Sequence, residues 1–311
     1  MNLLGALPAR FRRERVLIVG CGDVGLRAAR LLAGGSRVRV LALTSTPQRV
    51  PELRAQGVLP LQGNLDQSHS LRRLAGLATR VLHLAPPPSC GAAAARTDPR
   101  SRALVQALVR RTPAAALVYG STSGVYGDCQ GRWVSEVTAA RPGTARAWRR
   151  LDAEMALLRL GRISGVRSTV LRIPGIYAPD RAGGTPRQRL LRGTPVLRDE
   201  DDVYTNHIHA DDLARACVLA LWRGRAQRKI NVCDDTQLKM GDYFDFAADS
   251  YGLARAPRIE RAAAATQLSA LQLSFMSESR RLHNRRMKRE LRLVLRYPTV
   301  ADGLCAGASS A

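Results

Sequence analysis

The sequence predicts an α/β fold with a doubly wound parallel sheet, followed by a smaller C-terminal lobe. Short apolar runs rich in β-branched residues alternate with segments of helical periodicity through the first 174 residues. The first apolar run ends in a glycine-rich turn. Strands that alternate with helices form right-handed βαβ units, whose strands are parallel. The carboxyl ends of the strands therefore meet at one edge of the sheet, where such folds bind their ligands.

The first unit, residues 15–32, reads RVLIVGCGDVGLRAARLL. Residues 16–20 predict a buried strand, and the leucines and alanines that follow predict a helix that stops at Gly34 and Gly35. Between strand and helix stand three glycines with the spacing G-x-G-x-x-G, namely Gly20, Gly22 and Gly25. They allow a sharp turn, the approach of a pyrophosphate to the backbone, and close packing of helix on strand. The unit predicts a Rossmann dinucleotide site; an ordinary βα turn is the alternative.

The same periodicity predicts the remaining elements. Further strands are expected at residues 37–43, 58–61, 80–85, 116–120 and 168–173. Helices are expected at residues 101–111, 149–161, 240–251 and 277–291, with a short one inside 179–195. A short strand at 229–232 is expected to return to the first sheet. Residues 206–212, NHIHADD, are expected to lead from a strand into a helix capped by Asp211, and a metal site there is rejected.

The end of the second strand bears on the choice between NAD and NADP. In NAD-binding sheets an acidic residue about 20 residues after the glycine turn holds the ribose hydroxyls. Thr44, Ser45 and Thr46 stand there instead. With the nearby Arg49 they suit a ribose 2′-phosphate, so NADP is favoured over NAD; a plain polar loop is the alternative. The expected cofactor-binding residues are Gly20, Gly22, Asp23, Val24, Gly25, Thr44, Arg49, Asn64, Leu65, Leu84, Ala85, Pro86 and Pro174.

The composition is strongly basic, with a formal net charge of +24, and this alone would suggest a nucleic-acid partner. However, only three of the 49 Lys and Arg residues are lysine, the arginines are spread over the whole chain, and no basic run is interleaved with aromatic residues. We expect no specific nucleic-acid binding. Six scattered cysteines without a C-x-x-C pair argue against a zinc site or a disulfide framework. Because no membrane span or secretory signal is evident, a cytoplasmic protein is expected.

Several motifs occur in the order and spacing of a known family. They are VLIVGCGDVG, GNLD, LHLAPPP, YGSTSGVYGD with a later Glu136, VLRIPGIYAP and NHIHADDLARA. With them the chain resembles the extended short-chain dehydrogenase/reductases of the NAD-dependent epimerase/dehydratase type, in particular an atypical bacterial subgroup. The resemblance implies an NAD(P)-binding Rossmann domain at 15–174 and a substrate-capping lobe at 175–311, after a basic leader at 1–14. It also suggests a homodimer.

The resemblance implies a catalytic Ser or Thr and a Tyr-x-x-x-Lys pair, in which the tyrosine exchanges a proton with the substrate. Thr122 occupies the hydroxyl position, but Arg146 stands at the tyrosine position and Arg150 at the lysine position. An arginine, with a pKa above about 12, stays protonated and cannot act as a general base. It can hold a carboxylate or phosphate by a two-pronged hydrogen bond. Other groups considered for proton transfer are Tyr126, Tyr177, His207 and His209, each with a structural role as the alternative.

These observations predict an NAD(P)-binding oxidoreductase, or a relative of the epimerases and dehydratases, with a non-standard active site. The expected catalytic residues are Thr122, Arg146, Arg150 and Tyr126, and no metal is expected. A small-molecule substrate is expected, and the arginine-rich stretch 179–195 makes an anionic one a candidate. The alternative is a non-catalytic dinucleotide-binding sensor or scaffold. A third interpretation is a polyanion-binding protein that uses its charge.

Overall fold

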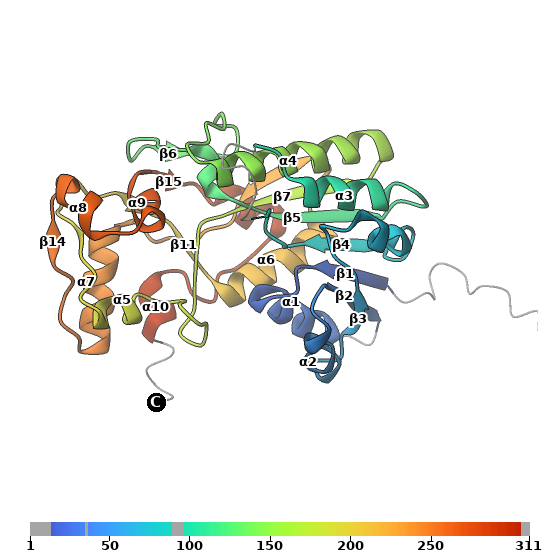
Figure 1. The fold of residues 1–311 in the computed structure, drawn as a ribbon, viewed down its shortest axis with the longest axis horizontal. Coiled ribbons are helices and arrows are strands. Elements are labelled where there is room, and N and C mark those ends of the chain that lie inside the picture. The colour runs from blue at the N-terminus through green and yellow to red at the C-terminus, as the bar shows by residue number, and fades with distance from the viewer. Residues whose placement is uncertain (1–13, 35–36, 89–95, 306–311) are drawn as a thin grey trace, which may run out of the picture.

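A seven-stranded parallel sheet forms the centre of the computed structural model, which describes residues 14–34, 37–88 and 96–305. The strand order is β3-β2-β1-β4-β5-β7-β12 (Figure 1). The strands are β1 (Glu14–Val19), β2 (Val38–Thr44), β3 (Leu59–Gln62), β4 (Arg80–His83), β5 (Ala116–Thr122), β7 (Arg167–Ile173) and β12 (Arg228–Asn231). The expected doubly wound α/β fold is confirmed. The chain leaves β1 in one direction and returns on its other side at β4, so the crevice between these two strand ends is the place for a ligand.

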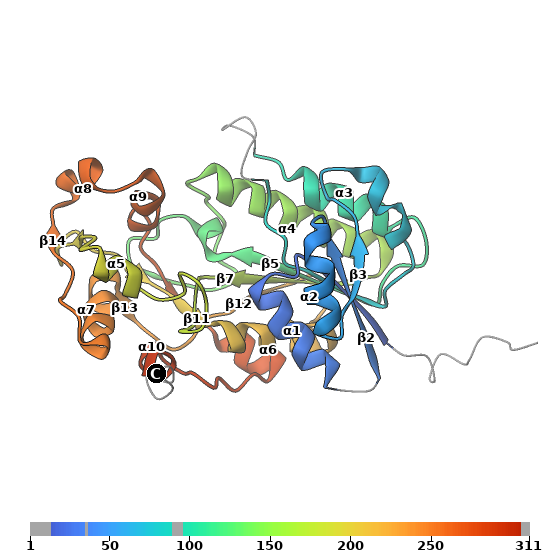
Figure 2. The same ribbon diagram turned by 60° about the horizontal axis from the view of Figure 1, so that its bottom comes forward.

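Helices cover both faces of the sheet (Figure 2). Helices α1 (Asp23–Ala33) and α6 (Ala210–Arg223) share one apolar core with the sheet. Helices α3 (Pro99–Leu108) and α4 (Ala145–Ser164) share the other. Strand β1 alternates between the two cores, because Val16 and Ile18 enter the first and Leu17 and Val19 the second. Burial on both faces explains why the central strands read as unbroken apolar runs.

Shorter elements connect these layers. They are η2 (Pro47–Arg49), α2 (Val50–Ala55), η3 (Ser68–Leu74), η4 (Ser123–Tyr126) and a one-turn π-helix, Met287–Leu291. The expected leader at 1–14 lies outside the described residues except for Glu14, with which β1 begins, and the same holds for 306–311. In the described part of the chain, no helix is both long and apolar enough to cross a membrane.

A helical lobe with its own apolar core lies beyond the carboxyl ends of the strands, at the left of Figure 1. Its helices are α5 (Arg187–Leu191), α7 (Met240–Tyr251), α8 (Arg261–Gln267), α9 (Ala270–Met276) and α10 (Val300–Cys305). Four two-stranded pairs lie outside the central sheet: β8 (Gly175–Tyr177) with β11 (His207–His209), β9 (Val196–Leu197) with β14 (Arg258–Ile259), β10 (Tyr204–Thr205) with β13 (Leu238–Lys239), and β6 (Trp133–Val134) with β15 (Arg281–Leu282). We call this part the helical lobe.

The chain passes back from the helical lobe to the sheet. Strand β12 pairs with β7 at the edge of the sheet, which confirms the expected return of residues 229–232. Met287, Leu291 and Leu293 then enter the core under α1 and α6. The sheet region is therefore completed by residues from near the end of the chain.

Two predictions of local structure are wrong. Of residues 277–291, only the end is helical, as the π-helix Met287–Leu291. Side-chain amides hold the preceding part extended: Asn206 bonds the backbone of Arg280 and Leu282, and Asn284 bonds the carbonyls of Cys233 and Asp234. These long-range contacts override the local helical preference. The cap of α6 is also not Asp211.

Helix α6 instead begins at Ala210, and the His209 ring nitrogen Nδ1 accepts the amide of Asp211 at 3.2 Å. Asp211 thus lies in the first turn of the helix, where its charge is favourable. This position leaves its carboxylate free to bind another element.

Candidate functional site

The glycine turn after β1 is packed beneath the exit of β4. Gly20 has a φ of +88°, and a Cβ there would lie 2.3 Å from the backbone nitrogen of Ala85. The amides of Leu84 and Ala85 both donate to the carbonyl of Val19, at 2.7 and 3.0 Å. Only glycine fits a positive φ and this close approach. The sequence therefore requires glycine at position 20 for the fold itself.

Gly22 differs from Gly20, because a Cβ there would meet nothing within 4 Å. Helix α1 starts at the next residue and has no side-chain cap. Its first-turn amides, at Asp23, Val24 and Gly25, have no partner inside the helix and point toward the open space at its start. An uncapped helix start with free space above a glycine fits a pyrophosphate. The five expected residues of the turn, Gly20, Gly22, Asp23, Val24 and Gly25, thus lie together at this helix start.

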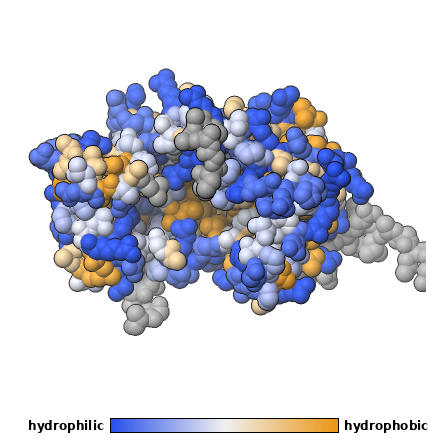
Figure 3. All heavy atoms as spheres, in the orientation of Figure 1, coloured by the Kyte–Doolittle hydropathy of each residue, from blue (hydrophilic) through white to orange (hydrophobic). Residues whose placement is uncertain are grey.

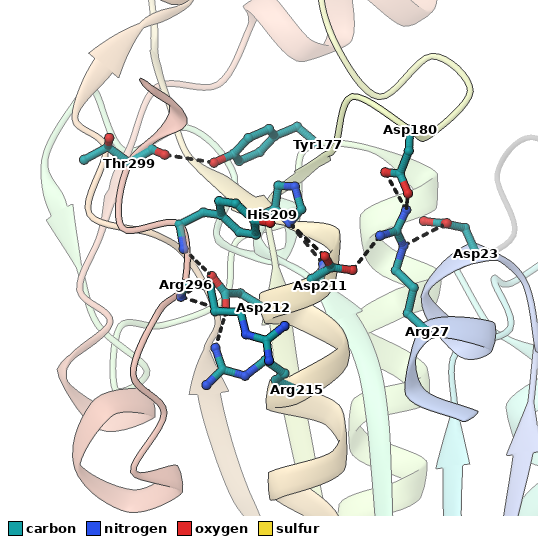
Figure 4. Close-up of polar contacts among 11 residues, drawn as sticks. Asp23, Arg27, Tyr177, Asp180, His209, Asp211, Asp212, Arg215, Arg296 and Thr299 are labelled. Atoms are coloured by element: carbon teal, nitrogen blue, oxygen red, sulfur yellow. Dashed lines mark hydrogen bonds and ion pairs between the residues drawn. The ribbon is translucent and has the colours of Figure 1, made fainter. Parts of the chain in front are cut away.

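Asp23 places a negative charge beside this turn, and two arginines contact it, of which Figure 4 shows Arg27. Arg27 donates to Asp23 at 3.0 Å, to Asp211 at 2.5 Å and to Asp180 at 2.7 Å. Arg181 lies 3.2 Å from the other oxygen of Asp23. Arg27 itself is only 10% exposed, and it joins α1, the loop after β8 and the start of α6, although the three carboxylates that it binds are partly exposed. The two guanidinium groups offset part of the negative charge beside the turn, which would otherwise repel a diphosphate.

The end of the chain is tied to the start of α6 in the same region (Figure 4). The carboxylate of Asp212 is fully buried and accepts the amides of Arg296 and Tyr297 at 2.9 to 3.0 Å. The ring of His209 stacks on Tyr297 with 3.8 Å between the ring centroids. These contacts give His209 and Asp212 structural roles, and His209 does not line the cavity described below.

Arg49, which was expected to hold a ribose 2′-phosphate, contacts both the glycine turn and a neighbouring carboxylate. Its Nη1 donates to the carbonyl of Cys21, within the glycine turn, at 2.8 Å, and its Nε pairs with Glu52 at 3.1 Å. The Thr44 hydroxyl is buried and is used within its own loop, where it bonds the backbone of Thr46. Arg49 therefore extends from the β2 loop to the turn, while Glu52 adds a carboxylate that the sequence prediction did not consider.

The expected adenine side of the crevice is held by its own contacts. The Asn64 side-chain oxygen accepts the amide of Asp66, and Leu65 packs on the core beneath α3. Arg100 binds Asp66 through two hydrogen bonds, at 2.8 and 2.6 Å, and donates to the carbonyl of Pro86 at 3.3 Å. The loops after β3 and β4 are thereby joined across the crevice by a pair that the sequence prediction missed.

A cavity of about 530 Å³ lies between the carboxyl ends of β5 and β7 and the helical lobe. Figure 3 shows a hollow between these two parts of the molecule, with hydrophobic surface at its floor. Of the expected residues, Thr122, Arg146, Arg150 and Pro174 line this cavity together, and so do Tyr177 and His207.

The cavity lining is strongly basic. It contains five arginines, which are Arg146, Arg150, Arg181, Arg189 and Arg280, against the single carboxylate of Glu278. An excess of positive charge in a concave site attracts anions.

Thr122 is supported from below by a buried ion pair. The neighbouring Ser121 donates to Glu154 at 2.6 Å, and Arg172 binds both oxygens of Glu154, at 3.1 and 2.8 Å. Glu154 and Arg172 are 0% and 1% exposed. The Thr122 hydroxyl accepts the amide of Gly124 at 3.2 Å. The pair joins α4, β5 and β7 directly under the site.

The two arginines of α4 have different surroundings. Arg150 donates through Nη1 to the carbonyl of Gly120 at 2.7 Å and to the Tyr119 hydroxyl at 3.2 Å. Arg146 lies over the ring of Phe275, at 5.1 Å from its centroid. Among the described residues, no hydrogen bond or ion pair is found for Arg146. Burial of the guanidinium lowers the pKa of Arg146, and the positive charge of Arg150 lowers it further.

The other groups considered for proton transfer are used elsewhere or are held neutral. Tyr126 is buried outside the cavity, and its hydroxyl donates to Asn231 at 2.7 Å. The Tyr177 hydroxyl donates to the carbonyl of Thr299, and burial raises its pKa. Burial, with a smaller effect of Arg189, lowers the pKa of His207 to about 3, so this ring is uncharged at neutral pH.

Glu278 and Arg280 are cavity residues that the sequence prediction missed. Glu278 accepts from Arg280 at 2.8 Å, and its Oε2 lies 3.8 Å from the place of a Cβ on Gly124, next to Thr122. They were missed because residues 277–291 were assigned to a helix. One signal was available, since Glu278 is the single acidic residue between Arg261 and Arg289.

Comparison with known proteins identifies relatives over most of the chain. The model of the NAD dependent epimerase/dehydratase family matches residues 16–233. A functionally unknown conserved protein from Silicibacter pomeroyi DSS is 28% identical, with a TM-score of 0.79 over 96% of this chain and 99% of that one.

Two further solved structures share the fold. One is a UDP-glucuronic acid 4-epimerase from Bacillus cereus in complex with NAD, at 18% identity, a TM-score of 0.74, and coverage of 95% and 97%. The other is MoeE5 in complex with UDP-glucose and NAD, at 21% identity, a TM-score of 0.74, and the same coverage. No curated protein matches the chain.

Proposed function

Because the chain belongs to the NAD dependent epimerase/dehydratase family, we propose that it binds NAD(P) and catalyses an oxidation, reduction or epimerisation of an anionic small molecule. The observation that carries this proposal is the alignment of two sites along one sheet edge. The uncapped start of α1, with free space above Gly22, fits a dinucleotide pyrophosphate. The basic cavity with Thr122 lies at the ends of β5 and β7.

We propose that NADP is preferred over NAD. Arg49 supports this preference, since its guanidinium is held at the glycine turn by Cys21 and lies at the end of β2. The residues directly after β2 carry no carboxylate that would hold the ribose hydroxyls. Glu52 opposes the preference by pairing with Arg49, so a 2′-phosphate would have to compete with this exposed ion pair.

The proposed substrate is a small molecule with negative charge. The five arginines of the cavity support this class. Both solved complexes contain NAD, and the MoeE5 complex also contains UDP-glucose, which makes sugar nucleotides the first compounds to test.

In the proposed reaction Thr122 donates a hydrogen bond to the reacting oxygen of the substrate. Arg150, fixed to the Gly120 carbonyl, sets the position of the start of α4 and offers its remaining donors to the cofactor ribose. A bound nicotinamide would supply or accept hydride. Because a guanidinium does not act as a general base, the proton of the substrate oxygen is exchanged with water in the cavity through the Thr122 hydroxyl.

Calorimetric titration with NADP⁺ and NAD⁺ tests the cofactor site. We expect micromolar binding, stronger for NADP⁺, and loss of binding in Gly22→Asp, whose side chain would fill the space for the pyrophosphate and add a like charge. Arg49→Gln is expected to weaken NADP⁺ about tenfold and NAD⁺ little, since one charge-assisted contact is lost. Binding that is unchanged in Gly22→Asp would contradict the proposed site.

A non-catalytic sensor or scaffold is the second candidate. It is favoured by Arg146 at the position where the family's proton-exchanging tyrosine is expected. In that case the loaded protein would show no change in nicotinamide absorbance with any sugar nucleotide or carbonyl compound. Substrate-dependent change of this absorbance would exclude the sensor interpretation.

A further inference from the structure

Arg146 projects from the first turn of α4 into the cavity with no anionic partner among the described residues. Its contact is the face of Phe275, which orients the guanidinium but does not neutralise its charge. Arg150 follows one helical turn later on the same side and also lines the cavity. Like charges at this spacing repel each other. The start of α4 therefore presents uncompensated positive charge to the cavity.

The nearest carboxylate does not remove this charge. Glu278 is held by Arg280 at 2.8 Å, and both side chains are nearly buried, at 13% and 12% exposure. Arg280 also donates to the carbonyl of Gly127 at 2.9 Å, while its Nε is buried without a partner. Glu278 and Arg280 thus cancel each other, and Arg146 and Arg150 remain.

The dinucleotide phosphates are not the anion that this charge would bind. They are expected at the start of α1, in the crevice between β1 and β4, where Arg27 and Arg181 are already held by the carboxylates of Asp23, Asp180 and Asp211. Arg146 belongs to α4, beside the end of β5, and shares its cavity wall with Thr122. An anion bound by Arg146 would therefore be part of the substrate and would lie next to the reacting oxygen.

We propose that Arg146 binds an oxyanion of the substrate, a carboxylate or a phosphate, on a carbon close to the reacting centre. This inference rests on the proposed function and specifies the substrate class of the same cavity. The planar guanidinium offers two parallel donors to the two oxygens of such a group. The family resemblance implies a proton-exchanging tyrosine at this position. In this chain Arg146 stands there and binds the charged group of the substrate. The substrate is accordingly a carboxylic acid or a phosphate ester at its reacting end.

Binding of simple probes tests this proposal without knowledge of the natural substrate. Protein saturated with NADP⁺ is titrated in the calorimeter with gluconate, glucose 6-phosphate and glucose. Gluconate and glucose 6-phosphate share a sugar-derived chain but carry a carboxylate or a phosphate, and glucose carries neither. We expect the charged probes to bind and glucose not to bind, and the stronger of the two identifies the oxyanion.

Three variants make the test specific. Arg146→Gln is expected to weaken the better charged probe about tenfold, and Arg146→Lys to have an intermediate effect because it keeps the charge but loses the fork. Arg159→Gln is the matched control, since Arg159 is exposed on the same helix and does not line the cavity. It should bind the probe within about twofold of the unaltered protein. An unchanged affinity for NADP⁺ in each variant shows that the fold is retained.

The outcomes separate this inference from the proposed function. If NADP⁺ and NAD⁺ both fail to bind, the proposed function is wrong, and the probes are then titrated against the free protein. If a dinucleotide binds but none of the charged probes does, the oxyanion site is wrong. It is also wrong if Arg146→Gln and Arg159→Gln weaken the probe equally, or if glucose binds as well as the charged probes.

Discussion

The buried pair of Glu154 and Arg172 supports a quantitative prediction about stability. Arg172 is 1% exposed, and both of its bonds to a carboxylate go to Glu154, which is itself inaccessible. Glu154→Gln keeps the size of the side chain and removes its charge. The guanidinium then remains buried without a counter-charge, and breaking a buried pair in this way costs about 3–5 kcal/mol of unfolding free energy. The Ser121 hydroxyl can still donate to the amide oxygen, so its bond adds little to the loss.

Urea denaturation followed by circular dichroism measures this loss. Removal of both charges, in Glu154→Leu with Arg172→Met, is the control, because apolar replacement of a whole buried pair is often neutral. We expect the double variant to be more stable than Glu154→Gln. A loss below about 1 kcal/mol in Glu154→Gln, or a double variant that is less stable than the single one, would refute the assignment of an uncompensated buried charge.

Three further predictions concern other parts of the molecule. Gly20→Ala should lower the unfolding free energy by about 3 kcal/mol or more, because its Cβ would overlap the Ala85 backbone. Gly22→Ala should have the same unfolding free energy as the unaltered protein but bind dinucleotide more weakly. Equal losses of unfolding free energy in the two variants would contradict this prediction. Burial raises the pKa of Asp234 to about 8, above its value of about 4 in the unfolded chain, so the folded state holds a proton that the unfolded state releases between these pH values. Stability from this group is complete below about pH 4 and falls by at most about 1.4 kcal/mol per pH unit up to about pH 8. Asp234→Asn, which resembles the protonated acid, should therefore stabilise at pH 8 and not at pH 4, as urea titrations at both pH values would show; a gain that is the same at both would disprove it. Arg27→Met leaves three carboxylates together without their shared cation. Amide hydrogen exchange at residues 178–184 should therefore become faster, while exchange in the central strands stays slow. Unchanged exchange at residues 178–184 would show that Arg27 does not hold this loop.

The sheet and the glycine turn were predictable because their signals are local. Each central strand is a short apolar run, and the turn after β1 has its glycines in sequence. The expected strand at 80–85 was two residues too long, since Leu84 and Ala85 leave the ladder to bond Val19 over the turn. Such boundary errors arise where a strand ends because its backbone bonds to a turn of another strand. Side-chain periodicity does not record this.

The cavity was predictable only in part. Thr122, Arg146 and Arg150 follow from motif positions along β5 and α4, and the structure brings them together. Glu278 and Arg280 come from a segment about 130 residues later in the chain. Their place depends on the amide side chains of Asn206 and Asn284, which bind that segment by tertiary hydrogen bonds. No local periodicity records such contacts.

Tyr126 illustrates the opposite error. It stands directly after a strand whose end lines the site, and its position in the chain suggested a role in proton transfer. Its ring lies instead under Arg172, at 4.6 Å, and its hydroxyl reaches Asn231 on the edge strand. The direction in which a side chain leaves a turn depends on packing, and the sequence does not specify it.

The return of late residues to the sheet limits how this chain can be divided. Ile230 from β12 and Met287 and Leu291 from the π-helix are fully buried in the core that α1 and α6 share with the sheet. A fragment ending near Pro174 would lack α6 and these side chains, and would expose the face of β4 and β5 on which α6 packs. A foreign C-terminal half grafted after Pro174 would therefore have to fill the core of the sheet as well as supply a substrate cavity. Single substitutions of cavity residues within the intact chain leave that core unchanged.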